Sequence, residues 1–191
     1  MLEGLKHLLH ARHTSLADVS DPTAVALHAR VASPNAVRSP FSGMAAAVFH
    51  VDFFVEHAPD NKNQPEHVTE YVGSVLIGGD LMVEADGLRV LLPGRRFRLE
   101  FEGAAGDGVT LDRPLPPGCE HIAKSPLTAR GALRYRELSL SHGEEVELVA
   151  TVAKVHRGGG YRDVHVEAGA PFEAQPDLAE VLVRYKMPSF A

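Results

Sequence analysis

Apolar and polar residues alternate with a period of two along most of the chain, the pattern of β-strands that bury one face. The clearest alternation predicts strands over residues 23–32, 44–57 and 95–102. Further runs predict strands over 67–77, 80–85, 88–92, 132–138, 144–156 and 161–168. The pair Asp86-Gly87 separates two of these runs and is a strong hairpin signal. We therefore expect a mainly β fold.

Two segments have a helical or ambiguous pattern. Leucines at spacings of three and four predict a helix over residues 2–17. Residues 176–184 fit a helix or a strand, and Asp177 before Leu178 favours a capped helix. Residues 103–131 are rich in Gly and Pro, so we expect a long excursion with little regular structure.

These elements predict a single β-barrel or sandwich-like domain with one core. We expect about eight to ten short antiparallel strands, a short N-terminal helix and, if 176–184 is helical, a C-terminal helix. The expected division is an N-terminal helical extension over residues 1–19 and a β domain over residues 20–191.

Composition narrows the class of protein. The chain has 191 residues and a net charge of -6, from 25 acidic and 19 basic residues, which disfavours a general nucleic-acid binder. Cys119 is the only cysteine, so no intramolecular disulfide can form, as suits a reducing compartment. No apolar run reaches the roughly 20 residues that span a bilayer, and residues 1–13 lack a signal-peptide core. We expect a cytoplasmic protein without a membrane span.

Two motifs, read in order, carry a family resemblance. The first is SPFSG (residues 39–43), which leads into a strand. The second is RYRELSLSHGEEV (residues 134–146), and between them EADGLRV (residues 84–90) forms a strand, Asp-Gly, strand unit. This order resembles the BAM ("beside a membrane") domain of GIDE-type E3 ubiquitin ligases and of their bacterial relatives, over about residues 20–185.

The resemblance implies a β domain that binds a substrate or partner. GIDE ligases also have two membrane helices and a C-terminal RING that needs a set of Cys and His ligands. This chain has one cysteine and no spanning helix. Ligase activity is therefore not expected, and the chain is interpreted as a soluble bacterial relative that retains the binding domain.

Two strands place His and carboxylate side chains on one face. His50 and Asp52 are two residues apart and can pair, bind a ligand or hold a metal. Asp163, His165 and Glu167 repeat the pattern and are the candidates if any metal is bound. Alternation alone also produces such a face, as a solvated polar surface.

A local basic cluster is the other candidate binding site. Arg95, Arg96 and Arg98 could meet a phosphate or an acidic partner. Glu100 and Glu102 follow on the same face and could neutralise them through cross-strand pairing.

We expect a non-catalytic adaptor module that needs no cofactor. Its protein or peptide partner would meet an exposed sheet edge, or the loops at residues 57–66 and 103–131. One alternative is a metal-assisted hydrolase built from the His and carboxylate strands. The other is an OB-like nucleic-acid binder that uses Arg96 and Arg98. A Cys119–His121 nucleophile is disfavoured, because Glu120 opposes thiolate formation.

Overall fold

The computed structural model describes residues 15–19, 22–59, 67–94, 96–102, 108–154, 172–177 and 181–186. In these ranges the strands form a seven-stranded, a four-stranded and a two-stranded sheet. Helical structure there is limited to η1 (Leu16–Asp18), α2 (Glu120–Ala123) and η2 (Pro126–Ala129). The expectation of a mainly β protein is confirmed.

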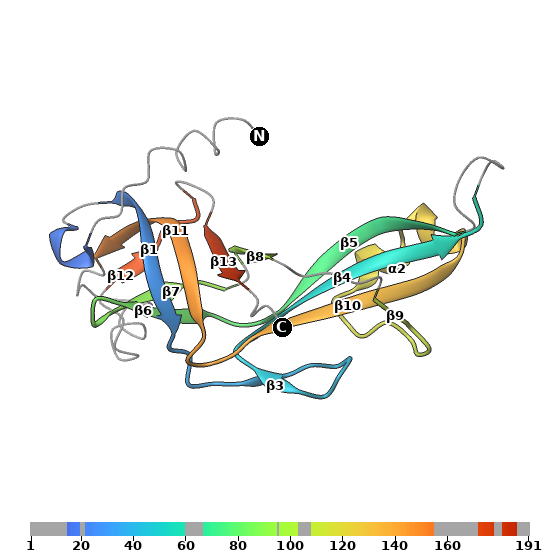
Figure 1. Ribbon diagram of the computed structural model, residues 1–191, viewed down its shortest axis with the longest axis horizontal. Coiled ribbons are helices and arrows are strands. Elements are labelled where there is room, and N and C mark those ends of the chain that lie inside the picture. Colours follow the sequence, from blue (N-terminus) through green and yellow to red (C-terminus); the bar gives the residue numbers. More distant parts are fainter. Residues whose placement is uncertain are drawn as a thin grey trace.

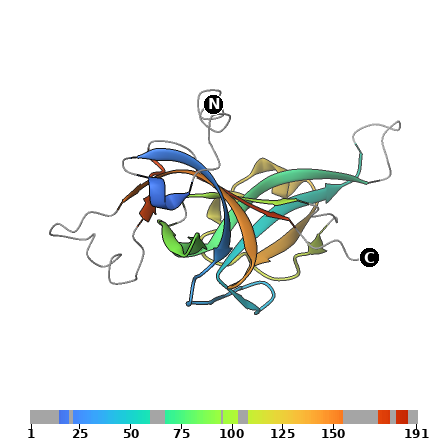
Figure 2. The ribbon, with the colours of Figure 1, turned by 60° about the vertical axis from the view of Figure 1, so that its left-hand side comes forward.

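Five strands close into a barrel. They are β1 (Thr23–Val31), β6 (Leu81–Ala85), β7 (Leu88–Leu92), β12 (Phe172–Ala174) and β11 (Glu145–Lys154), in that order, and β11 pairs again with β1. Figure 2 shows β1 and β11 running together across it. Within the ring β12 and β7 run parallel, and the other neighbouring strands run antiparallel. This strand order and these directions are those of an OB-type Greek-key barrel.

The turn between β6 and β7 confirms the hairpin predicted from Asp86-Gly87. Both residues have positive φ, 53° and 73°, the requirement of a type I′ turn. Only glycine adopts such a φ without steric cost, and Asp tolerates it better than most other residues. The hairpin strands lie within a residue of the predicted bounds.

Two more strands extend the barrel sheet from β11. They are β13 (Leu182–Lys186) and, beyond it, β8 (Arg98–Glu102), which pairs with β13 in parallel. The all-antiparallel expectation is therefore wrong at two pairs of strands. The helix favoured over residues 176–184 is also wrong for the described residues 181–184, because Leu182 and Val183 are buried in a strand.

Two insertions into the barrel connections build a second lobe, the arm (Figure 1). The connection from β1 to β6 contributes β4 (Val48–His57) and β5 (Val68–Gly78). The connection from β7 to β11 contributes β9 (Val109–Thr110) and β10 (Ala132–Leu140). These strands form the sheet β5-β4-β10-β9. Residues 103–131 are therefore more regular than predicted, since their described part includes β9, α2 and η2.

The arm has its own apolar cluster, so the expectation of one core is wrong. Phe49 and Phe53 of β4 lie fully buried in this cluster, with Ile122 of α2. The base of the arm instead belongs to the barrel core, which includes Val48 and Leu140. These two residues are register partners at the ends of β4 and β10. The barrel core therefore fixes where the arm begins.

The SPFSG segment covers the arm cluster between β2 (Val37–Arg38) and β3 (Ala45–Ala46). Ser39 Oγ accepts hydrogen bonds from the backbone N–H groups of Phe41 (2.9 Å) and Ser42 (3.2 Å). The Phe41 ring is buried, 5.7 Å from the ring of Phe53. Both serine hydroxyls donate to the carboxylate of Glu137 on β10. The two motif segments thus meet in space.

Some predicted elements lie outside the described residues. The strand predicted over residues 161–168 lies wholly outside them, and so does most of the helix predicted over residues 2–17. The described end of that predicted helix overlaps the 3₁₀ helix η1. None of the helices in the described ranges has the length and apolar character needed to cross a bilayer.

Candidate functional site

One face of the arm sheet is covered by the SPFSG segment and α2, whereas the other face carries polar and aromatic side chains. On β4 alternation directs His50, Asp52 and Phe54 to this open face, and Phe49, Val51 and Phe53 to the cluster. On β10, Arg136 lies opposite Asp52 in the register. The predicted outward direction of His50 and Asp52 is therefore correct, although Asp52 is buried among its neighbours.

A β-bulge adds an aromatic side chain to the open face. The register of β4 and β5 shifts between Phe53 and Phe54, so that Phe53 pairs with Gly73 and Phe54 with Tyr71. Val72 is the extra residue and packs on the arm cluster. An extra residue reverses the side-chain alternation beyond it, which brings Tyr71 to the same face as Phe54.

The open face and β8 enclose a hollow of about 430 Å³ where the arm meets the barrel. We call this the junction hollow. Its lining residues come from four strands, and they are His50, Asp52, Phe54, Tyr71, Ser74, Arg98, Leu99 and Arg136. Three of the residues singled out in the sequence, His50, Asp52 and Arg98, therefore line one hollow.

Asp52 is the electrostatic centre of the junction hollow. Its Oδ1 lies 2.8 Å from Nε2 of His50, and its Oδ2 accepts a hydrogen bond of 2.8 Å from Nη2 of Arg136. Burial alone would raise the pKa of Asp52, but the hydrogen bonds from His50 and Arg136 outweigh burial and lower it. Asp52 is therefore ionised at neutral pH and holds both neighbours in place.

Aromatic rings form the other wall. The rings of Phe54 and Tyr71 meet edge to face at 5.8 Å, and the guanidinium carbon of Arg136 lies 5.5 Å from the centre of the Phe54 ring. Tyr71 is 55 % exposed, unusually high for a large apolar side chain in this structure. An exposed ring beside an immobilised guanidinium is a surface that can receive a partner.

The predicted arginine cluster is divided. Arg98 lines the junction hollow and pairs at 3.3 Å with Glu100 of its own strand. The cross-strand partner of Glu100 is not one of the clustered arginines but Arg184 of β13, at 3.2 Å. Arg96 instead forms an exposed ion pair with Asp177. Arg95 lies outside the described residues.

Sequence reasoning missed Arg136, Phe54 and Tyr71 as site residues. Phe54 and Arg136 do occupy outward positions of alternating strands, which is the signal that could have found them. Nothing local marks the contact of Arg136 with Asp52, since 84 residues separate them in the chain.

The structure gives no support to a metal or thiol centre in the ranges that it describes. Within these ranges no group of three or more His, Cys, Asp or Glu side chains is arranged to hold a metal ion. Asp163, His165 and Glu167, the metal candidates, lie outside them. Cys119 is buried, and burial, followed by the charge of Glu120, raises the pKa of its thiol.

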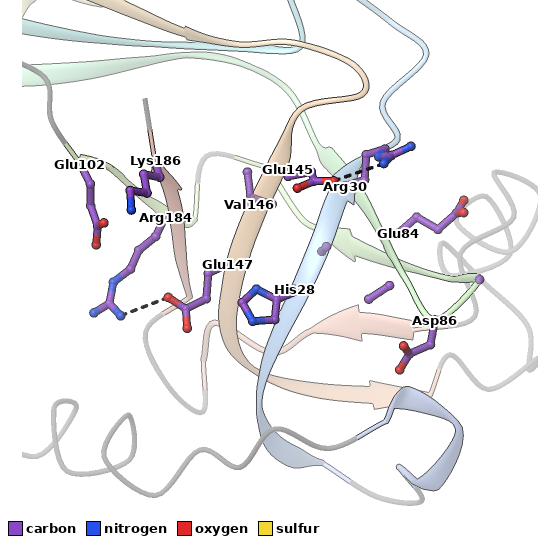
Figure 3. A pocket seen from close by; sticks show the side chains of 13 residues that line it. His28, Arg30, Glu84, Asp86, Glu102, Glu145, Val146, Glu147, Arg184 and Lys186 are labelled. Carbon is purple, nitrogen blue, oxygen red and sulfur yellow. Dashed lines mark hydrogen bonds and ion pairs between the residues drawn. The ribbon is translucent and has the colours of Figure 1, made fainter. Parts of the chain in front are cut away.

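A larger hollow of about 620 Å³ lies on the outside of the barrel, where β1, β11 and β13 face the β6–β7 turn (Figure 3). Two ion pairs lie in its lining, Arg30 with Glu145 at 3.3 Å and Arg184 with Glu147 at 3.4 Å. Among the described residues that line it there is no Phe or Tyr. It is a charged surface without an apolar anchor, and the junction hollow is the stronger candidate.

Comparison with models of known families, with characterised proteins and with solved structures finds no match to this chain.

Proposed function

We propose that this protein is a non-catalytic module that binds a peptide segment of another protein in the junction hollow. One observation carries the proposal. The hollow combines an exposed aromatic ring, Tyr71, with two guanidinium groups, Arg98 and Arg136, beside a buried carboxylate that is already neutralised. Aromatic and arginine side chains are the ones most enriched at protein interfaces.

The hydrogen bonds of the hollow favour binding over catalysis. A general base needs a free lone pair directed at a substrate proton. The carboxylate of Asp52 is only 10 % exposed and is held by His50 at one oxygen and Arg136 at the other, so it is not presented to a substrate proton. Ser74 lies opposite Asp52 and not opposite His50, so these residues do not form a Ser-His-Asp relay.

The charges of the hollow indicate the chemistry of the peptide. Its two arginines each have a carboxylate partner, Asp52 for Arg136 and Glu100 for Arg98, and 63 % of the Arg98 side chain is exposed. An acidic side chain would compete with Glu100 for the exposed guanidinium of Arg98, and an apolar or aromatic side chain would pack on Tyr71 and Phe54. We therefore expect a peptide with a carboxylate beside an apolar residue.

Membership of the BAM family is part of the same proposal. The family is described as a partner-binding domain, and the resemblance depends on SPFSG and on the segment around Glu137. The hydrogen bonds from Ser39 and Ser42 to Glu137 give these distant segments a common structural role. That contact supports the resemblance without deciding the partner.

Selection from random peptides displayed on phage tests the proposal. Enriched peptides should combine Asp or Glu with an aromatic or branched apolar residue. Tyr71→Ala and Arg98→Ala should each weaken their binding about tenfold, equal to about 1.4 kcal/mol. The matched control is Arg89→Ala, an exposed arginine of β7 paired with Glu84, which should bind like the unaltered protein.

Enrichment of no peptide, or equal binding by all three variants, would contradict peptide recognition here. Binding to homopolymeric single-stranded nucleic acid that falls steeply with salt, and that Tyr71→Ala abolishes, would instead favour the nucleic-acid alternative.

A further inference from the structure

We infer that Glu70 and Arg130 are positioning residues of the proposed peptide site: their ion pair holds β5 in the bulged register that keeps Tyr71 on the open face. The inference rests on the proposed function, because Tyr71 is the exposed ring of the junction hollow. Neither Glu70 nor Arg130 lines that hollow, so both act only through the register of β5.

Two registers are possible for the first half of β5. In the structure Tyr71 lies opposite Phe54 on the open face, and Glu70 lies opposite Val55 on the covered face. Without the bulge, the pairing would move by one residue and Val72 would lie opposite Phe54. Such a shift sends each side chain to the other face of the sheet. Tyr71 would then point to the covered face and Glu70 to the open one, an arrangement that we call the slipped register.

The slipped register competes with the bulged one because each buries an apolar side chain. Slipping would turn the ring of Tyr71, which is 55 % exposed, toward the arm cluster. It would also remove Val72 from its packing on that cluster. Apolar burial alone therefore does not decide between the two registers, and a specific polar contact can.

The contacts of Glu70 supply that polar contact on the covered face. Nη1 of Arg130 lies 3.1 Å from Oε2 and 3.3 Å from Oε1 of Glu70. Nε2 of His57 lies 3.5 Å from the same carboxylate, and the His57 side chain is only 4 % exposed. By alternation His57 shares the face of β4 that carries Phe53, so it lies on the covered side. A Glu70 turned to the open face would lose both partners.

The position of Arg130 is fixed by its neighbours in the chain. Its backbone N–H donates to the carbonyl of Leu127 at 2.9 Å, at the end of η2. The next residue, Gly131, lies so close to the end of β4 that a Cβ on it would be 2.1 Å from the carbonyl oxygen of Glu56. Arg130 is therefore held beside β4, where its guanidinium meets Glu70 when β5 is in the bulged register.

Charge reversal, with NMR of the full chain as the readout, tests the register. In the unaltered protein, nuclear Overhauser contacts should join the rings of Phe54 and Tyr71, which meet at 5.8 Å. Glu70→Lys places a like charge beside Arg130, so these contacts should be replaced by contacts between Phe54 and Val72. Binding of a phage-selected peptide should weaken about tenfold, as for Tyr71→Ala. Glu70→Lys combined with Arg130→Glu restores an ion pair, and the affinity should return to within about twofold of the original.

The control is Glu84→Lys, the same change in the exposed ion pair with Arg89 on the barrel, which should alter neither readout. Glu70→Gln removes the charge without repulsion and replaces Glu70→Lys if that variant does not fold. It should weaken peptide binding about twofold to fivefold.

The outcomes separate this inference from the proposed function. Contacts between Phe54 and Tyr71 that persist in the Glu70 variants, or that the double variant does not recover, would overturn the inference. Lower stability with unchanged contacts would show a purely structural role and would overturn it as well. The expected exchange of contacts in a protein that binds no selected peptide would overturn the proposed function and leave the control of register intact.

Discussion

Replacement of Asp52 by asparagine removes the central charge of the junction hollow and keeps the side-chain shape. Asp52 is only 10 % exposed and is bonded to His50 and Arg136. A hydrogen bond to a charged group contributes about 1.5–3 kcal/mol, against about 0.5–1.5 kcal/mol for a neutral one. Two such bonds would lose roughly 2–3 kcal/mol. The side chain of Arg136 is 26 % exposed and regains some hydration, so we expect a loss of about 2 kcal/mol.

The pH dependence of this loss follows from the lowered pKa of Asp52. Burial opposes the shift and the bonds from His50 and Arg136 cause it. Because the folded protein binds this proton more weakly than the unfolded chain, Asp52 contributes its full stability above the unfolded pKa of about 3.9. The contribution is lost as pH falls through the lower, folded pKa. The difference between the two proteins should persist at pH 5 and shrink below about pH 4.

Urea unfolding, followed by circular dichroism, measures the difference. With a slope of about 2 kcal/mol/M, the midpoint of D52N should fall by about 1 M at pH 7. The control is Glu145→Gln, the same carboxylate-to-amide change in the exposed ion pair with Arg30. It should lower the free energy of unfolding by less than about 0.5 kcal/mol. A difference at pH 7 no larger than that control, or one that stays the same at pH 3, would refute the electrostatic argument.

Three further predictions concern packing and reactivity. Phe41→Ala should lower the free energy of unfolding by about 3–5 kcal/mol, and Phe41→Leu by about 1–2 kcal/mol, both measured in urea. Gly131→Ala should lower the free energy of unfolding by about 1–3 kcal/mol, because the new Cβ would lie 2.1 Å from a backbone carbonyl oxygen of β4. Gly79→Ala is the control: its Cβ would enter open space, and the free energy of unfolding should change by less than about 0.5 kcal/mol. Cys119 should react with a thiol reagent on the order of tenfold or more slowly in the native protein than in urea, since burial and then Glu120 raise its pKa.

Each of these has a result that contradicts it. Equal stability of the two Phe41 variants would mean that the ring does not fill the arm cluster. Equal behaviour of the two glycine variants would contradict the close approach at Gly131. Rapid labelling of the native thiol would place Cys119 at the surface.

The alternating pattern predicted most of the strands because each alternating run has one face to bury. Phe49 and Phe53 are fully buried while His50 lies on the opposite face, as the period of two requires. The pattern failed where a short apolar run fits both helix and strand. Leu182 and Val183 belong to such a run, and only pairing with β8 and β11 makes it a strand.

The junction hollow was only half predictable from the sequence. His50 and Asp52 follow from alternation within one strand. Tyr71 does not, because one bulged residue reverses the alternation of β5. Gly73 at the bulge is a local hint, but a glycine within a strand does not by itself specify the register shift. Arg136 depends on the pairing of β10 with β4, which strand patterns alone do not specify.

The attachment of the arm at Val48 and Leu140 has a consequence for how such a protein can vary. Both residues are fully buried in the barrel core, whereas the far end of the arm, where β4 ends and β5 begins, points away from the barrel in Figure 1. Lengthening or shortening the chain at that far end by whole residue pairs keeps the strand register and every contact nearer the barrel. The length of the arm can therefore change while the junction hollow near its base stays the same.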